Sequence, residues 1–225
     1  MKKLNYNFAI LYAKNLRSLH YLSNLKKFNM IPSSIITIPN NKITHSINKK
    51  HKIPIKKKEK VLNFFKTRSK IININNSTKN LLEKLSNLKE KYIIFAGNYG
   101  QILPENFFKI KKFFIHVHPG DLPNYKGSTT YYYEYINENK ISFSSIYLNH
   151  KLDQGRILLK KTFNPKKIKF EKIDEYYDPI LRSKVLIETL KKLKMKNKVI
   201  TNKKTNSYYV IHPLIKYLAI FKSKN

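Results

Sequence analysis

The chain has 225 residues, 41% of them hydrophobic and 13% aromatic, which is enough for one packed α/β domain with a small appendage. It contains no cysteine, which excludes disulfides, zinc–cysteine sites and thiol nucleophiles and suits a reducing cytoplasm. An apolar run that starts at Phe8 resembles a signal peptide but is too short for one, and no stretch is long enough to span a membrane. We therefore expect a cytoplasmic protein.

The chain is strongly basic, with 46 Lys and Arg against 13 Asp and Glu, a net charge of +33. Such a charge is typical of proteins that bind nucleic acid or anionic membranes. The lysines are spread along the whole chain, however, and arginine, the better bidentate phosphate reader, is scarce. The accompanying wealth of Asn, Ile, Tyr and Phe fits A/T-rich codon usage. We interpret the charge as mainly compositional, with a mild attraction for anionic substrates.

The first 40 residues predict a βαβ unit. Residues 7–13 and 33–38 are buried-strand patterns, and residues 16–28 place leucines three apart on one helical face. A βαβ unit predicts a parallel sheet with a right-handed crossover. No G-x-G-x-x-G follows the first strand, which argues against a Rossmann dinucleotide site.

The middle of the chain continues this alternation. Residues 40–58 are polar and predict an exposed connection or a peripheral strand. The helices expected next are 59–67, 77–91, 104–109 and 127–138, and the strands are 70–74, 92–96 and 113–117. Residues 92–96 have the pattern of a central strand. The fold class predicted is α/β, a Rossmann-like, mostly parallel twisted sheet flanked by helices.

The last third predicts a hairpin of residues 142–148 and 157–163, followed by a helix at 178–194 with Asp178 as its cap. Residues 196–206 predict a loop or hairpin edge, and residues 208–221 are an apolar tail that must pack on something. We expect residues 1–165 to form the main domain and residues 166–225 to pack on it.

All five glycines lie between residues 92 and 161, together with two histidines two residues apart, His116 and His118. Glycine occurs where the backbone needs positive φ or must approach a ligand closely. Side chains two apart on a strand point to the same side, so both imidazoles should reach the carboxyl end of residues 113–117. Asp153 follows another strand. The sequence therefore predicts two imidazoles and a carboxylate at one edge of the sheet.

The run from His116 to Gly127, His-Val-His-Pro-Gly-Asp-Leu-Pro-Asn-Tyr-Lys-Gly, resembles the signature of folate-dependent formyltransferases. That signature is Asn-x-His-Pro-Ser-Leu-Leu-Pro, then a basic–Gly pair and later Leu-Asp-x-Gly, matched here by Asp153, 35 residues after His118. Residues 96–104 are similar to the segment lining the family's folate pocket. The family includes methionyl-tRNA, glycinamide ribonucleotide and sugar-nucleotide formyltransferases. The family's Asn falls on His116, and its Ser-Leu on Gly120 and Asp121.

The resemblance implies that an acceptor amine attacks the formyl carbon of 10-formyltetrahydrofolate. His118 would assist proton transfer, Asp153 would hold His118 and help take the amine proton, and His116 would replace the Asn that stabilises the oxyanion. Six residues would contact the folate: Gln101, Ile102, Leu103, Asn149, His150 and Leu152. Three residues would contact the acceptor: Tyr125, Lys126 and Gly127.

Two alternatives stay open at this point. The His-x-His…Asp pattern is also a known metal-ligand set, although the motif around it already has a metal-free explanation. A non-catalytic or tRNA-directed RNA-binding protein of the same fold would also match. The chain after residue 158 is too short for the β-barrel of the tRNA enzyme, which leaves a small acceptor, a nucleotide-linked amino-sugar. A homodimer is compatible with these features.

Overall fold

The computed structural model describes residues 7–51, 55–75, 78–193 and 207–224, with the backbone alone for residues 55–59. The chain forms two compact units, residues 1–115 and residues 116–225, and each is described by itself. The loop expected at residues 196–206 lies outside the described residues. The predicted domain boundary at residue 165 stays a prediction.

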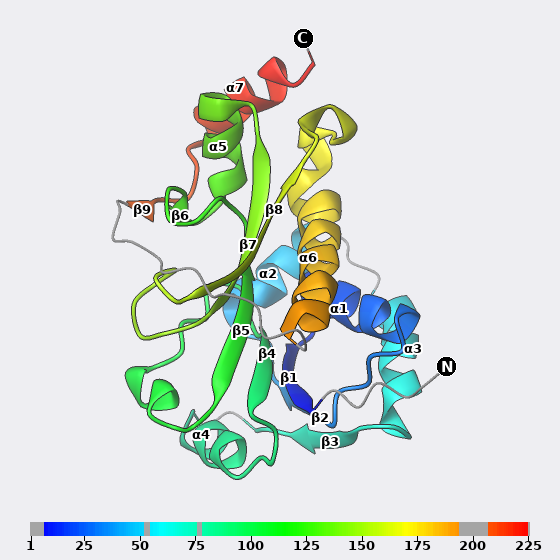
Figure 1. The fold of residues 1–225 in the computed structure, drawn as a ribbon. Coiled ribbons are helices and arrows are strands. Elements are labelled where there is room, and N and C mark those ends of the chain that lie inside the picture. The colour runs from blue at the N-terminus through cyan, green and yellow to red at the C-terminus, as the bar shows by residue number, and fades with distance from the viewer. Residues whose placement is uncertain (1–6, 52–54, 76–77, 194–206, 225) are drawn as a thin grey trace. The chain divides into compact units, whose positions relative to one another are not determined.

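The first unit is built on parallel strands (Figure 1). The sheet begins in the order β3 (Lys70–Asn73), β2 (Ser34–Ile38), β1 (Phe8–Ala13), β4 (Tyr92–Ala96) and β5 (Phe113–His118), and these pairs are all parallel. Strand β1 is buried along its whole length, because both faces of a parallel sheet are covered. The predicted βαβ opening and the central position of residues 92–96 are confirmed.

Four α-helices and a 3₁₀ helix connect these strands: α1 (Leu16–Lys27), α2 (Lys42–Lys50), α3 (Ile55–Lys66), α4 (Thr78–Ser86) and Glu105–Phe108. The prediction for residues 40–58 was wrong, because most of that stretch is helical. Asn41 caps α2 by accepting a hydrogen bond from the Thr44 amide at 2.8 Å. Helix α4 is shorter than expected. Beyond it the chain turns so that the buried Glu90 carboxylate accepts a 2.6 Å hydrogen bond from Ser34 Oγ.

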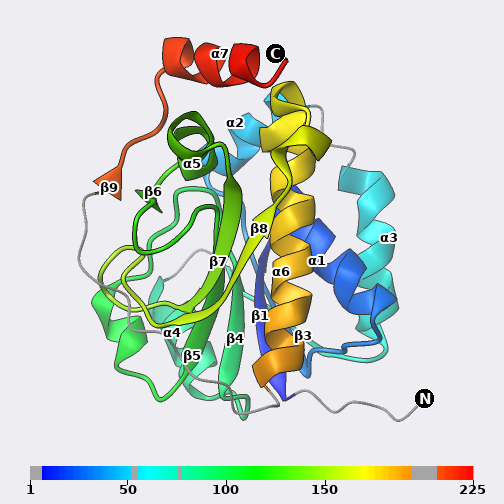
Figure 2. The ribbon, with the colours of Figure 1, turned by 45° about the horizontal axis from the view of Figure 1, so that its top comes forward.

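The second unit contains the antiparallel hairpin of β7 (Ile141–Tyr147) and β8 (Ile157–Phe163), as predicted. Helix α6 (Asp178–Leu193) packs along this hairpin (Figure 2). A π-helical turn, Ile173–Tyr177, runs directly into α6, so Asp178 lies inside a continuous helix and is not its cap. Its carboxylate instead accepts from Arg182 Nε at 2.8 and 2.9 Å.

The remaining elements are small. Helix α5 (Thr130–Glu138) starts three residues later than expected, and α7 (Pro213–Lys222) packs against it. The two-residue strands β6 (Lys126–Gly127) and β9 (Ser207–Tyr208) pair in parallel. The complete strand order β3-β2-β1-β4-β5-β7-β8 makes a mostly parallel mixed sheet flanked by helices, which confirms the predicted fold class.

Candidate active site

The turn after β4 is held in one conformation by side chains of the first unit. The Gly97 carbonyl accepts hydrogen bonds from Asn15 Nδ2 and an Arg17 guanidinium N–H, both at 2.8 Å. The Asn98 amide donates to Gln101 Oε1 at 2.8 Å. A Cβ on Gly97 would lie 2.4 Å from that Oε1, so glycine is needed for the Gln101 side chain to fold back onto the turn. The glutamine amide therefore has a defined orientation.

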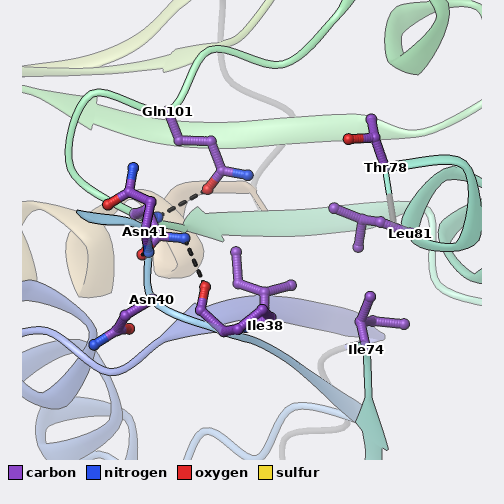
Figure 3. A pocket seen from close by; sticks show the side chains of 9 residues that line it. Ile38, Asn40, Asn41, Ile74, Thr78, Leu81 and Gln101 are labelled. Atoms are coloured by element: carbon purple, nitrogen blue, oxygen red, sulfur yellow. Dashed lines mark hydrogen bonds between the residues drawn. The ribbon is translucent and has the colours of Figure 1, made fainter. Parts of the chain in front are cut away.

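Gln101 lines a cavity of about 310 Å³ beside the ends of β2 and β3. Figure 3 shows its amide extending over the cavity, across from Ile38, Ile74 and Leu81. The lining side chains are uncharged: Ile38, Pro39, Asn40, Asn41, Ile74, Thr78, Leu81, Asn98 and Gln101. In open α/β sheets ligands bind beyond the carboxyl ends of the strands, which is where this cavity lies.

His118 and Asp153 form a buried pair in the second unit. Their side chains are exposed by 2% and 6%, and His118 Nδ1 lies 3.3 Å from Asp153 Oδ1. His118 Nε2 donates to the Tyr125 carbonyl at 2.6 Å. Both ring nitrogens thus face oxygen acceptors, an arrangement that suits the doubly protonated imidazolium. The predicted approach of His118 and Asp153 is confirmed.

Asp153 is held by its backbone as well as by His118. Its φ is +52°, a left-handed conformation that non-glycine residues seldom adopt. Its second oxygen, Oδ2, accepts from the Gly127 amide at 2.9 Å. Burial alone would raise the pKa of Asp153. The positive charge and hydrogen bond of His118, the charge of His116 and the Gly127 amide outweigh burial and hold that pKa well below its usual range.

The segment Tyr125, Lys126 and Gly127, here named the strap, connects these two side chains. Burial and the Glu138 carboxylate raise the pKa of Tyr125 to about 12, and its hydroxyl donates to Glu138 at 2.8 Å. The Lys126 side chain is fully buried, which lowers its pKa, while the charge of Asp153 opposes that change. Acceptor contacts by the strap residues stay a prediction, and the strap's observed contacts include both members of the candidate catalytic pair.

The loop between His118 and the strap is fixed on the hairpin. Ser144 Oγ donates to the Gly120 carbonyl at 2.7 Å and accepts from the Leu122 amide at 3.1 Å. Asp121 pairs with Lys160 at 2.7 Å. Because Ser144 and Lys160 belong to β7 and β8, the motif that follows His118 is attached to rigid elements.

The other predicted site residues differ in exposure. His116 is half-buried on β5, and its charge contributes to the low pKa of Asp153. Ile102 and Leu152 are large apolar side chains exposed by 72% and 54%, which suits contact with an aromatic ring. His150 is exposed. The remaining folate-contact candidates are half-buried Asn149 and buried Leu103.

Three features of the second unit were not found by sequence reasoning. Thr130 Oγ1 lies 3.3 Å from His118 Nε2 and donates to the Pro119 carbonyl. Glu134 is a fully buried carboxylic acid whose Oε2 accepts from the Ser142 amide at 3.0 Å. Burial raises the pKa of Glu134. An acid on an aromatic-rich helix has no sequence signature of its own. The third feature, Tyr208, is described below. His212 caps α7 and is exposed.

Within the described part of the chain, no three His, Asp or Glu side chains are grouped so that they could hold a metal ion. His118 and Asp153 bind each other instead of converging on a shared position. None of the described helices has the length and apolar character needed to cross a membrane.

The seven-stranded, mostly parallel sheet flanked by helices matches the fold of a formyltransferase domain. The family model for formyl transferases matches residues 7–178, and the chain belongs to this family. No curated protein sequence matches the chain significantly.

Solved structures share the fold at low sequence identity. A variant of HypX from Aquifex aeolicus has a TM-score of 0.59 and 12% identity over 92% of this chain and 31% of its own. A sugar N-formyltransferase from a Shewanella species has a TM-score of 0.59 and 15% identity over 96% and 87%. The N-formyltransferase of Helicobacter canadensis, in complex with folinic acid and dTDP-3-aminofucose, has a TM-score of 0.56 and 17% identity over 90% and 70%. The chain thus spans about a third of HypX and most of the other two.

Proposed function

We propose that the chain transfers a formyl group from 10-formyltetrahydrofolate to the amine of a small acceptor, a nucleotide-linked amino-sugar. The observation that carries this proposal is the buried pair of His118 and Asp153, 3.3 Å apart, in a chain of the formyl transferase family. The folate supplies the formyl group. The exposed apolar side chain of Ile102 and the uncharged surroundings of Gln101, both in the first unit, would suit its ring system.

The reaction forms a bond between the acceptor nitrogen and the formyl carbon and breaks the bond from that carbon to the folate nitrogen. Negative charge develops on the formyl oxygen, and an N–H of His116 would stabilise it in the role of the family's Asn. The amine gives up a proton as it attacks, and the folate nitrogen gains one as it leaves. His118, held as an imidazolium by the charge of Asp153, would give a proton to the leaving folate nitrogen, and the neutral ring would then take up the proton lost by the amine.

An ionised Asp153 is essential to this role. Its pKa is held well below the usual range, so the carboxylate stays charged throughout the physiological pH range. A negative carboxylate next to the ring stabilises the imidazolium form of His118, which is the form that can give up a proton. A neutral partner would not provide this stabilisation.

The acceptor assignment rests on fold likeness to sugar N-formyltransferases, one of them in complex with a dTDP-linked amino-sugar. The net charge of +33 would attract an acceptor that carries phosphates. The same charge would attract tRNA, so tRNA belongs in any acceptor panel.

The test is incubation with 10-formyltetrahydrofolate and a panel of nucleotide-linked amino-sugars, tRNA and glycinamide ribonucleotide, with folate release as the readout. We expect release with an amino-sugar nucleotide and its loss in His118→Ala. His45→Ala, at an exposed histidine of α2, is the matched control and should retain activity. Full turnover by His118→Ala would refute the mechanism, and formylation of tRNA alone would refute the acceptor class.

A further inference from the structure

The strap contacts both members of the candidate catalytic pair. The Tyr125 carbonyl accepts from His118 Nε2 at 2.6 Å, and the Gly127 amide donates to Asp153 Oδ2 at 2.9 Å. The two contacts come from residues only two apart. A displacement of the strap would therefore change the hydrogen bonds of the imidazole and of the carboxylate together.

The strap is in turn paired with β9 near the C-terminus. In the parallel pair of β6 and β9, Lys126 lies opposite Ser207 and Gly127 opposite Tyr208. The Ser128 amide donates to the Tyr208 carbonyl at 3.1 Å. A Cβ on Gly127 would lie 2.0 Å from that carbonyl oxygen, and Gly127 has a φ of +106°. Glycine is therefore what permits the two backbones to come this close.

The Tyr208 side chain adds aromatic contacts to this pairing. Its ring stacks on Tyr125 with centroids 5.4 Å apart and an interplanar angle of 20°, and it lies 4.7 Å from the ring of Tyr133 on α5. Nearby, the Ile211 amide donates to Thr129 Oγ1 at 2.9 Å. Tyr208 thus holds the strap through its backbone and its ring, and the same ring links the strap to α5.

We propose that Tyr208 is a positioning residue for formyl transfer, which it serves by holding the strap that orients His118 and Asp153. Tyr208 lies beyond residue 178, where the match to the family model ends. A segment outside the matched region thereby takes part in building the site. The effect of Tyr208 on kcat rests on the proposed function, whereas its effect on the surroundings of His118 does not.

The variant Tyr208→Ala removes the stacking while leaving the main-chain pairing able to form. We expect kcat to fall about 10- to 100-fold, since a misplacement of about 1 Å at a reacting group costs about that much. The KM for folate should change less than kcat, and the pH profile of kcat should shift because the surroundings of His118 change. Tyr208→Phe keeps the ring and should restore both the kcat and the pH profile of wild type. Tyr217→Ala, at a tyrosine of α7 that is 65% exposed, is the matched control and should behave as wild type.

A second readout separates this inference from the proposed function. The ¹⁵N signals of the His118 imidazole, assigned by their loss in His118→Gln, report its protonation without any turnover. We expect these signals to move in Tyr208→Ala and to return in Tyr208→Phe. If wild type transfers no formyl group but the signals still move, the proposed function fails and the positioning role stands.

Unchanged imidazole signals together with an unchanged pH profile in Tyr208→Ala would overturn the positioning role. If Tyr208→Ala does not fold, Tyr208→Leu, which keeps an apolar side chain, is measured in its place with the same two readouts. Tyr208→Ala could also lose the same fraction of its activity at every pH while the imidazole signals stay as in wild type. That result would assign Tyr208 a merely structural role and would also overturn the inference.

Discussion

Replacing Asp153 by Asn separates the charge of this residue from its hydrogen bonds. The Gly127 amide, 2.9 Å from Oδ2, is a donor and will select the Asn oxygen. The Asn NH₂ then faces His118 Nδ1. Since an NH₂ group can only donate, Nδ1 must lose its proton, and Nε2 keeps the one that it donates to Tyr125. The variant should therefore fold with His118 locked as the neutral Nε2–H tautomer.

The size of the effect follows from the separation of the pair. Two unit charges 3.3 Å apart attract each other by about 5 kcal/mol at an effective dielectric constant of about 20. Both side chains are nearly inaccessible to solvent, so screening by water is small. Without that attraction the imidazolium of His118 would be less stable by this amount relative to the neutral ring, and a step that needs the imidazolium would slow by between three and four powers of ten, at about 1.4 kcal/mol for each factor of ten. We expect kcat to fall about 1,000-fold, with a smaller change in the KM for either substrate.

The assay is single-turnover formyl transfer by wild type and Asp153→Asn, followed by release of tetrahydrofolate. Asp121→Asn, which alters a half-buried carboxylate paired with Lys160, is the matched control and should retain most of the activity. Activity of Asp153→Asn within about threefold of wild type would refute the idea that the carboxylate charge supports His118. A His118 imidazole that remains doubly protonated in the variant would refute the tautomer argument.

The same pair gives the fold a defined pH dependence. The pKa of Asp153 is depressed in the folded chain, so its contribution to stability is fully present above the unfolded value of about 4 and is lost as the pH falls below it. The Tm difference between wild type and Asp153→Asn should therefore shrink as the pH is lowered from about 5 to 3. A difference that stays constant over this range would contradict the depressed pKa.

Three further changes test other parts of the structure. Glu134→Gln should raise Tm at pH 8 more than at pH 4, because burial raises the pKa of Glu134 and its ionisation at high pH costs stability. The Gln side chain can still accept from the Ser142 amide, and an equal change in Tm at both pH values would contradict the raised pKa. Gly127→Ala should destabilise the fold by about 1–3 kcal/mol, in urea unfolding, through its positive φ and its contact with the Tyr208 carbonyl; wild-type stability would rule out the close approach. Asn15→Ala should cost about 1–2 kcal/mol, because this residue caps α1 and is buried, and an unchanged Tm would argue against the cap.

The strands were predictable from sequence because burial of both faces gives a strand a simple sequence pattern. β1, β2, β4 and β5 are short runs of β-branched and aromatic residues, since both faces of a parallel sheet are covered, and their observed limits lie within one residue of the predicted ones. Their order in the chain then required a parallel sheet, which confines strand-end loops such as those after β4 and β5 to one edge.

Helix α2 was not predicted from the sequence because its buried face is polar. Its buried residues are Thr44 and Asn48. Thr44 Oγ1 accepts from the Tyr99 amide at 3.0 Å, and Asn48 Nδ2 donates to the Lys14 carbonyl at 2.7 Å. A helix that packs through hydrogen bonds to loops has no apolar periodicity to detect. Its sequence therefore reads as an exposed connection.

In the candidate site, too, some residues could be predicted from local sequence motifs, whereas others depend on contacts between segments far apart in the sequence. His118 and Asp153 were identified because each belongs to a local motif that keeps its order along the chain. The partner of the strap carries no such motif: β9 has two residues, too few to show the alternation that marks a strand. Tyr208 also meets Tyr125 across 82 intervening positions of sequence. Lys126 is an example. A lysine beside a glycine suggests a contact with a phosphate or an acceptor, but in the structure Lys126 pairs with the distant strand β9 and is completely buried. Candidate catalytic residues can thus be recognised from local motifs, but the residues that contact and hold them become visible only in the folded chain.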